Sequence, residues 1–189
     1  MSPPAAAAPP LLSSHSPTDV STTCATYALT TAEFHGLHAR SAAAKASAYC
    51  PYSRFRVGAT VLTRAGAFVD GANIENAAYP VGTCAERVAF GKAVTEGHYR
   101  GAGEGGEEKQ GMEGRGRGFK AVAVCTDISP PASPCGMCRQ FIREFCDLDT
   151  PILMFDKDGS YVVMRLEQLL PMSFGPEALP SPGSAGAQG

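Results

Sequence analysis

The stretch "KAVAVCT" (residues 120–126) decides how this chain folds, because it is a continuous apolar run of strand length. A strand that is apolar on both faces lies in the interior of a sheet that is covered on both sides. Alternating patterns over 55–63 and 68–74 predict a hairpin joined at the turn "RAGA". Residues 151–155 and 160–166 predict two more strands on either side of the turn "DKDG". We therefore expect one sheet of about five strands.

Helical patterns alternate with these strands. Residues 31–49 place apolar side chains on one face at helical spacing, and Thr30 or Thr31 suits the N-cap position. Further helices are predicted over 84–96, over 134–145 and over the short segment "LEQLL" (166–170). This order of elements predicts an α/β fold, in which a mixed sheet carries helices on both faces.

The composition is that of a globular protein with irregular segments added. The 189 residues are 44% hydrophobic and 18% charged, which suits a single domain, expected over 26–179. Residues 1–25 and 180–189 are rich in small residues and proline, so we expect disordered tails there. The Gly-rich, charged segment 97–118 is expected to be a flexible insertion within the domain.

Charge and cysteine content narrow the classes of partner and compartment. A net charge of -2 and a pI near 6.1 argue against nucleic acid and membrane surfaces as partners, and favour a small molecule. No apolar run is long enough to span a bilayer. Seven cysteines, an odd number, are typical of a reducing compartment. Arg40 is the first basic residue apart from histidine, so neither a secretory nor a mitochondrial signal is indicated. We expect a cytoplasmic protein.

Two short motifs together predict a metal site. In "SPCGMCRQF" (133–141), Cys135 and Cys138 lie three residues apart at the start of a predicted helix, on the same face. In "VGTCAERVAF" (81–90), Cys84 lies at the start of another helix. Helix N-termini lower thiol pKa values, and thiolate is the form that binds metal. Three thiolates leave the fourth position of a tetrahedral Zn²⁺ for water, which is typical of a catalytic site.

A glutamate gives this site a chemical role. Glu86 lies two positions after Cys84. In zinc deaminases a glutamate that is not a ligand moves protons beside three Cys or His ligands and a Pro-Cys-x-x-Cys element. Taken alone, a Cys-x-x-Cys pair is also typical of a structural zinc site or a redox pair. Cys125 and Cys146 would be the nearest fourth ligands, but their apolar surroundings favour buried small residues. The other cysteines and the histidines lack ligand spacing, and we expect the histidines at the surface: Cys24, Cys50, His15, His35, His38 and His98.

From about residue 49 to residue 177 the sequence resembles the small, homotetrameric, nucleoside-specific cytidine deaminases. The matching segments are "YCPYSRFRVGA", "NIENAAYPVGTCAER", "SPCGMCRQFIREF" and "EQLLPMSFGPEAL", in the order of the family. The resemblance implies a three-layer α/β/α fold, and one Zn²⁺ per subunit on Cys84, Cys135 and Cys138. It implies Glu86 as proton shuttle in the hydrolysis of cytidine and 2′-deoxycytidine to uridine and 2′-deoxyuridine, with release of ammonia, in pyrimidine salvage.

The resemblance also implies contacts to the substrate. Asn73 and Glu75 would hold the ribose hydroxyls, Phe55 would pack against the pyrimidine, and the backbone of Ala85 would bond the base. An i, i+2 pair at a strand end directs both side chains the same way, which suits two adjacent hydroxyls. A plain turn pair is the alternative for Asn73 and Glu75, and a core position is the alternative for Phe55.

Three further roles depend on the family resemblance. Tyr79 would help to line a pocket shared between subunits, and Phe174 would reach the same ring from a neighbouring subunit of a homotetramer. Arg87 would bond to the zinc thiolates and withdraw part of their charge, which restores Lewis acidity to the metal. The alternatives are a core position for Phe174 and an exposed helix position for Arg87.

Three other functions remain open at this point. A deaminase of a nucleoside antibiotic such as blasticidin S shares both cysteine motifs, although the intact "NIEN" segment favours a plain ribose. A polynucleotide-editing deaminase is disfavoured by the acidic pI. A non-catalytic binding module with a structural zinc is the third alternative.

Overall fold

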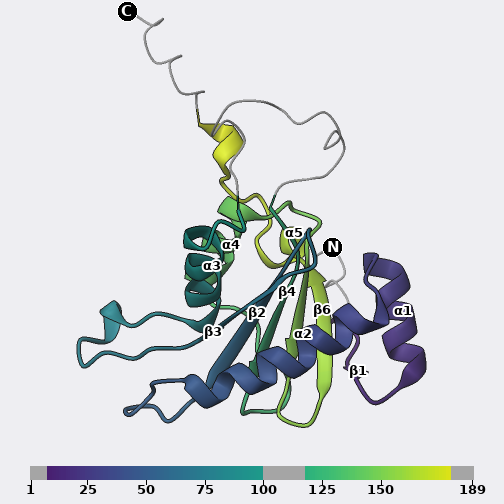
Figure 1. Ribbon diagram of the computed structural model, residues 1–189, viewed down its shortest axis with the longest axis horizontal. Helices are drawn as coiled ribbons and strands as arrows, with labels where there is room; N and C mark the ends of the chain where they lie inside the picture. Colours follow the sequence, from purple (N-terminus) through teal and green to yellow (C-terminus); the bar gives the residue numbers. More distant parts are fainter. Residues whose placement is uncertain (1–7, 100–117, 180–189) are drawn as a thin grey trace, which may run out of the picture.

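The sheet forms around the strand that was predicted at its centre. The computed structural model describes residues 8–99 and 118–179 (Figure 1). Its strands are β1 (Leu12–Ser13), β2 (Val57–Thr63), β3 (Phe68–Ala72), β4 (Phe119–Thr126), β5 (Pro151–Phe155) and β6 (Ser160–Arg165). They form one sheet in the order β1-β6-β5-β4-β2-β3. β4 and β5 are parallel and the other pairs are antiparallel, which confirms the predicted mixed sheet.

Alternate side chains of β4 enter two separate cores. Val122 and Val124 pack with the residues of α3 and α4, whereas Ala121, Ala123 and Cys125 pack with those of α1 and α2. The helices are α1 (Pro17–Tyr27), α2 (Thr31–Ala44), α3 (Ala85–Thr95), α4 (Gly136–Phe145) and the short α5 (Leu166–Leu169). The predicted three-layer α/β/α arrangement, with helices on both faces, is therefore confirmed (Figure 1).

Small residues in the strands bring the helices close to the sheet. A Cβ atom on Gly71 in β3 would meet the backbone of Ala85 and Ala89 in α3. A Cβ atom on Gly58 in β2 would meet the backbone of Ser41 in α2. The start of α3 is thus held directly against β3, and this contact fixes where Cys84 and Glu86 lie relative to the sheet.

The prediction of a disordered tail over 1–25 is wrong for its described part, residues 8–25. β1 pairs with the edge strand β6, and α1 buries Val20, Thr23 and Cys24 against the second core. The Thr23 hydroxyl lies 2.8 Å from the hydroxyl of the fully buried Tyr161. A helix with few large apolar residues is ordered here because the sheet supplies the remaining apolar surface. β1 is also the reason why the sheet has six strands rather than about five.

Other predictions about irregular segments fall partly outside the described residues. Three stretches lie outside the described residues: 1–7, the tail at 180–189, and 100–117, which is the greater part of the predicted insertion. Within the described residues, no helix has the length and apolar character needed to cross a membrane. His38 is half-buried and stacks on Phe155 with ring centroids 4.4 Å apart, so the expectation that all histidines lie at the surface is wrong for His38.

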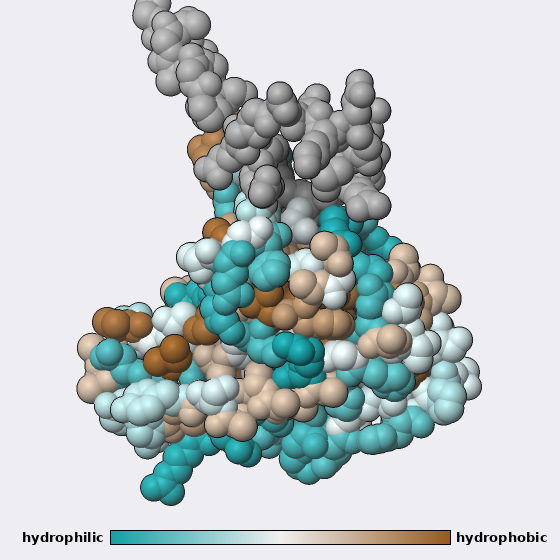
Figure 2. Space-filling model, viewed as in Figure 1, coloured by the Kyte–Doolittle hydropathy of each residue, from teal (hydrophilic) through white to brown (hydrophobic). Residues whose placement is uncertain are grey.

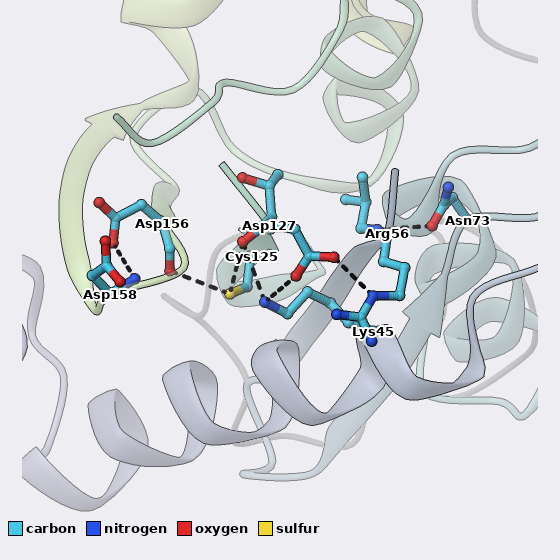
Figure 3. Close-up of polar contacts among 9 residues, drawn as sticks. Lys45, Arg56, Asn73, Cys125, Asp127, Asp156 and Asp158 are labelled. Atoms are coloured by element: carbon cyan, nitrogen blue, oxygen red, sulfur yellow. Dashed lines mark hydrogen bonds and ion pairs between the residues drawn. The ribbon is translucent and has the colours of Figure 1, made fainter. Parts of the chain in front are cut away.

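A charged network fixes the end of β4, where the chain leaves the sheet toward Cys135. Lys45, just after α2, contacts Asp127 at 3.0 Å and donates to the carbonyl of Thr126. Arg56, just before β2, donates to the same aspartate at 2.8 Å (Figure 3). Asp127 thereby joins the end of α2, the beginning of β2 and the end of β4.

Asp156 anchors the turn between β5 and β6, and its replacement by asparagine should destabilise the protein. This carboxylate is 2% exposed and accepts hydrogen bonds from the amides of Asp158 and Ser160 and from the Ser129 hydroxyl. Burial alone would raise the pKa of Asp156, but these hydrogen bonds outweigh it and hold the pKa below the ordinary value of 3.8. For Asp156→Asn we expect a loss of about 1–3 kcal/mol in the free energy of unfolding at neutral pH.

The sign of the pH dependence follows from the lowered pKa. The stabilisation by Asp156 is present above pH 3.8 and is lost as the pH falls through the lower pKa of the folded state. Urea unfolding at neutral and acidic pH should therefore show a difference between parent and variant that shrinks in acid. Asp158→Asn, at an exposed position of the same turn, is the matched control. Equal stability of Asp156→Asn and the parent at neutral pH would contradict this account.

Candidate metal centre and active site

Two helices begin side by side and bring three sulfur atoms together. Cys84 is the N-cap of α3 and Cys135 is the N-cap of α4, and neither side chain makes a capping hydrogen bond. Cys138 lies in the first turn of α4 and is fully buried. The three Sγ atoms all lie within 4.8 Å of one another, and those of Cys84 and Cys135 are 3.9 Å apart. The structure thus brings together the predicted ligand set.

The donor set fits zinc with one position open. Tetrahedral Zn²⁺ with Zn–S bonds of about 2.3 Å places its sulfur ligands about 3.8 Å apart, close to the separation of Cys84 and Cys135. All the cysteines are free thiols, and none of the others joins this cluster in the described part of the chain. Cys125 and Cys146 are buried in the core, as predicted. Three protein ligands leave the fourth position of the ion to a non-protein ligand.

The electrostatics of the cluster favour thiolate at Cys84, whereas the hydrogen bond with Cys84 and burial raise the pKa of Cys138. A hydrogen bond from Cys138 lowers the pKa of Cys84 to about 5, burial opposes the shift, and Arg87 reinforces it. The Arg87 guanidinium donates to the carbonyl of Gly82 at 3.2 Å, and the same nitrogen lies 3.9 Å from Cys84 Sγ. Arg87 is therefore placed against the sulfur cluster, where its positive charge offsets the charge of the thiolates.

Glu86 is a buried carboxyl in the first turn of α3. It is 4% exposed, and burial raises its pKa because the charged form is poorly solvated there. The negative charge of Cys84 acts in the same direction. A carboxylate with a raised pKa accepts a proton more readily than an exposed glutamate does. Ala85, between Cys84 and Glu86, is fully buried.

A cavity of about 380 Å³ opens beside Cys84. Its lining comes from residues 52–53, 73–76, 79 and 82–84, which include the predicted Asn73, Glu75 and Tyr79. The loops at 49–56 and 73–84 project together beyond the end of the sheet (Figure 1). The volume lies within the range of pockets that hold small ligands.

The comparison with known proteins identifies the family. A model described as the cytidine and deoxycytidylate deaminase zinc-binding region matches residues 32–154. The chain belongs to this family. It is 41% identical over 143 residues to the cytidine deaminase of Sporosarcina psychrophila, which covers 76% of this chain and 92% of that protein. It is 37% identical over 133 residues to a probable cytidine deaminase of Dictyostelium discoideum, covering 70% and 77%.

Solved structures agree with the family assignment. The crystal structure of the cytidine deaminase from Burkholderia pseudomallei superposes with a TM-score of 0.62 at 33% identity, covering 74% of this chain and 98% of that one. A cytidine deaminase structure from Mycobacterium tuberculosis superposes with a TM-score of 0.57 at 32% identity, covering 75% and 97%. The resemblance to cytidine deaminases inferred from the sequence is confirmed.

In this deaminase-family chain, Asn73 and Glu75 have bonding partners that the sequence did not predict. Asn73 accepts from the amide of Val57 and donates to the carbonyl of Phe55, both at 2.8 Å. The Glu75 carboxylate accepts from the amides of residues 52–53, and its hydrogen bond with Ser53 lowers its pKa. Both side chains line the cavity and also hold the segment that carries Phe55.

Phe55 and Phe174 lie outside the cavity lining of the described chain. Phe55 is half-buried just before β2. Phe174 is 60% exposed, and its carbonyl accepts from the Gln140 side chain at 3.0 Å. Tyr79 is 73% exposed at the rim, with its ring centroid 5.9 Å from that of Tyr52. The structure therefore does not bring Phe174 to the cavity of its own chain.

Arg139 is a site residue that the sequence reasoning missed. Its guanidinium donates to the carbonyls of Pro134 and Leu169 at 2.7 Å and to the Ser133 hydroxyl at 2.8 Å. These bonds fix the loop that leads into Cys135. A basic residue near a helix N-terminus is electrostatically unfavourable, and that conflict was the available signal that Arg139 has other partners.

Removal of one sulfur should release the metal. Cys135 is exposed, so Cys135→Ala should fold while losing one of three ligands. We expect the parent to retain about one zinc per chain after dialysis, and the variant to retain little, by elemental analysis. Cys50→Ala, outside the cluster, should keep the parental zinc content. Full zinc retention by Cys135→Ala would show that Cys135 is not a ligand.

Proposed function

We propose that this protein hydrolyses cytidine and 2′-deoxycytidine to the uridine products and ammonia. The prediction of a zinc-dependent cytidine deaminase is confirmed at the level of the family, through the family match and the relatives. The observation that carries the proposal for this chain is the buried Glu86 in the turn that follows Cys84, beside a three-sulfur cluster with one position open.

Cys84, Cys135 and Cys138 would hold one Zn²⁺ per subunit. When bound, Zn²⁺ supplies a Lewis acid that makes a water molecule acidic enough to act near neutral pH. Three thiolates outweigh the charge of the ion by one unit, and Arg87 withdraws part of this excess through its contact with Cys84.

Glu86 performs the proton transfers. Its carboxylate takes a proton from the attacking water and delivers it to N3 of the cytosine ring as C4 is attacked. Glu86 then takes the hydroxyl proton at C4 and passes it to the amino group, so the C4 carbonyl forms as the C–N bond breaks and ammonia leaves. One carboxyl serves as base and then as acid, because each proton that it takes from oxygen is passed on to nitrogen. The backbone of Ala85, held against the metal ligands, bonds the base.

The cavity lining supports a nucleoside as substrate. Asn73 and Glu75 face the cavity and would bond the ribose hydroxyls with the bonding capacity that their backbone contacts leave unused. Phe55, on the segment that these residues hold, would pack against the pyrimidine. A long single strand is disfavoured, because the net charge of the chain is negative.

The exposed apolar residues around the cavity support a homotetramer with shared sites. Ile74, Tyr79 and Val81 are between 48% and 73% exposed, and hydrophobic surface is visible on the projecting loop (Figure 2). Several exposed apolar side chains close together in one loop are typical of an interface. In the tetramer, Tyr79 would line a shared pocket and Phe174 would reach the ring bound by a neighbouring subunit. A cytoplasmic enzyme of pyrimidine salvage is consistent with this activity.

Replacement of Glu86 by glutamine should separate metal binding from catalysis. We expect Glu86→Gln to keep its zinc and to lose about 10²–10⁴-fold in kcat, because glutamine cannot transfer the proton. Loss of cytidine absorbance measures turnover, and elemental analysis measures zinc. Glu144→Gln, at an exposed position of α4, is the control and should match the parent. Full activity of Glu86→Gln would refute the mechanism.

A substrate panel decides between the proposed activity and its rivals. We expect turnover of cytidine and deoxycytidine, and none of cytosine, adenosine or a short single strand. Turnover confined to blasticidin S or to the single strand would select the antibiotic or the polynucleotide deaminase. Stoichiometric zinc without any turnover would select the structural-zinc module.

Mixing of two defective chains should show whether sites are shared. Glu86→Gln lacks the proton shuttle and Phe174→Ala lacks the aromatic side chain. If Phe174 acts in a neighbour's site, co-refolded chains recover parental sites, and activity exceeds the sum of the separate preparations. Light scattering should give about four times the 19.6 kDa of one chain. Simple averaging of the two activities would show that Phe174 does not act between subunits.

A further inference from the structure

The helix that carries two of the metal ligands also holds the segment that carries Phe174. Arg139, Gln140 and Arg143 all project from α4 toward this segment. Arg139 donates to the carbonyl of Leu169 and Gln140 to the carbonyl of Phe174. Arg143 bonds side chains on either side of Phe174. The C-terminal segment is thus attached to α4 through polar contacts over successive turns of the helix.

Arg143 makes the most enclosed of these contacts. Its side chain is 5% exposed, it donates to the Ser173 hydroxyl at 3.0 Å, and it forms an ion pair with Glu177. Gly175 is buried against it, and a Cβ atom at that position would meet the guanidinium. The segment 173–177 therefore wraps around one buried cation. A buried cation without its partners destabilises a protein. The favoured arrangement of the segment is therefore the one in which Ser173 and Glu177 both contact Arg143.

This arrangement determines the direction of Phe174. The backbone at Met172 is in the left-handed region (φ 55°), which is uncommon for a residue with a side chain, and the Met172 side chain is fully exposed. Since Met172 has no buried contact to hold this turn, the bonds from α4 hold it. Between the turn and Gly175, Phe174 is left 60% exposed. Arg143 lies five residues beyond Cys138, which is about 7.5 Å along α4.

We infer that Arg143 is a positioning residue for substrate binding: it fixes the segment 173–177 so that Phe174 enters the cavity of a neighbouring subunit. This rests on the proposed function, in which Phe174 packs against the bound ring. Loss of the clamp leaves Phe174 present but free to occupy other positions. The cost appears in substrate affinity, because the ring contact exists in the ground state as well as in the transition state.

The test compares the steady-state kinetics of single and double variants. We expect Arg143→Met to raise the KM for cytidine about tenfold while kcat changes little. Arg143→Lys, which retains the charge, should recover part of this loss. Because Arg143 acts through Phe174, the double variant Arg143→Met/Phe174→Ala should be no worse than Phe174→Ala alone. Arg64→Met, which removes a surface guanidinium paired with Asp147 at 2.9 Å, is the matched control.

Further measurements distinguish a loss of folding from a loss of positioning. Zinc content and thermal unfolding show whether Arg143→Met folds. If it does not fold, Glu177→Gln removes the same ion pair by changing its exposed partner. Unchanged KM in the folded Arg143→Met or Glu177→Gln variant, or additive losses in the double variant, would overturn this inference alone. Absence of cytidine turnover in the parent chain would overturn the proposed function and this inference with it.

Discussion

Two helix N-termini that meet beside one sheet are the constraint on which the rest of this structure depends. α3 and α4 begin at Cys84 and Cys135, and their N-cap sulfurs lie 3.9 Å apart. Hydrogen bonds within the cluster and the nearby Arg87 stabilise the Cys84 thiolate, so the fold favours a cation at this point before any cation binds. The contact of α3 with Gly71, and the bonds of Arg139 to the loop before α4, maintain this meeting point.

Charge balance at this point explains the residues around the sulfurs. The charge of Arg87 opposes that of Cys84, whereas Glu86 is buried beside the same thiolate and its pKa is raised. Burial of a carboxyl costs several kcal/mol in solvation, so its presence here favours a chemical role over a structural one. Farther out, the network around Asp127 fixes the end of β4, and the polar face of α4 fixes the segment that carries Phe174.

Much of this architecture could be predicted because it depends on local patterns. The apolar run over 120–126 indicates the centre of the sheet, and cysteine spacing at two helix starts indicates the sulfur cluster. α1 was missed because it buries small and hydroxyl side chains such as Thr23, which show no apolar stripe. The clamp of Arg143 on Glu177 was missed because the partners lie 34 residues apart, and no local pattern encodes such a contact. The backbone bonds of Asn73 likewise depend on tertiary structure.

The coordination of the bound metal tests the central claim most directly. X-ray absorption at the zinc edge, measured on the purified protein, counts the sulfur and oxygen neighbours of the ion. The account predicts three sulfur neighbours at about 2.3 Å and one lighter neighbour at about 2.0 Å. Four sulfur neighbours would contradict it, since a closed site leaves no position for the water that the reaction consumes.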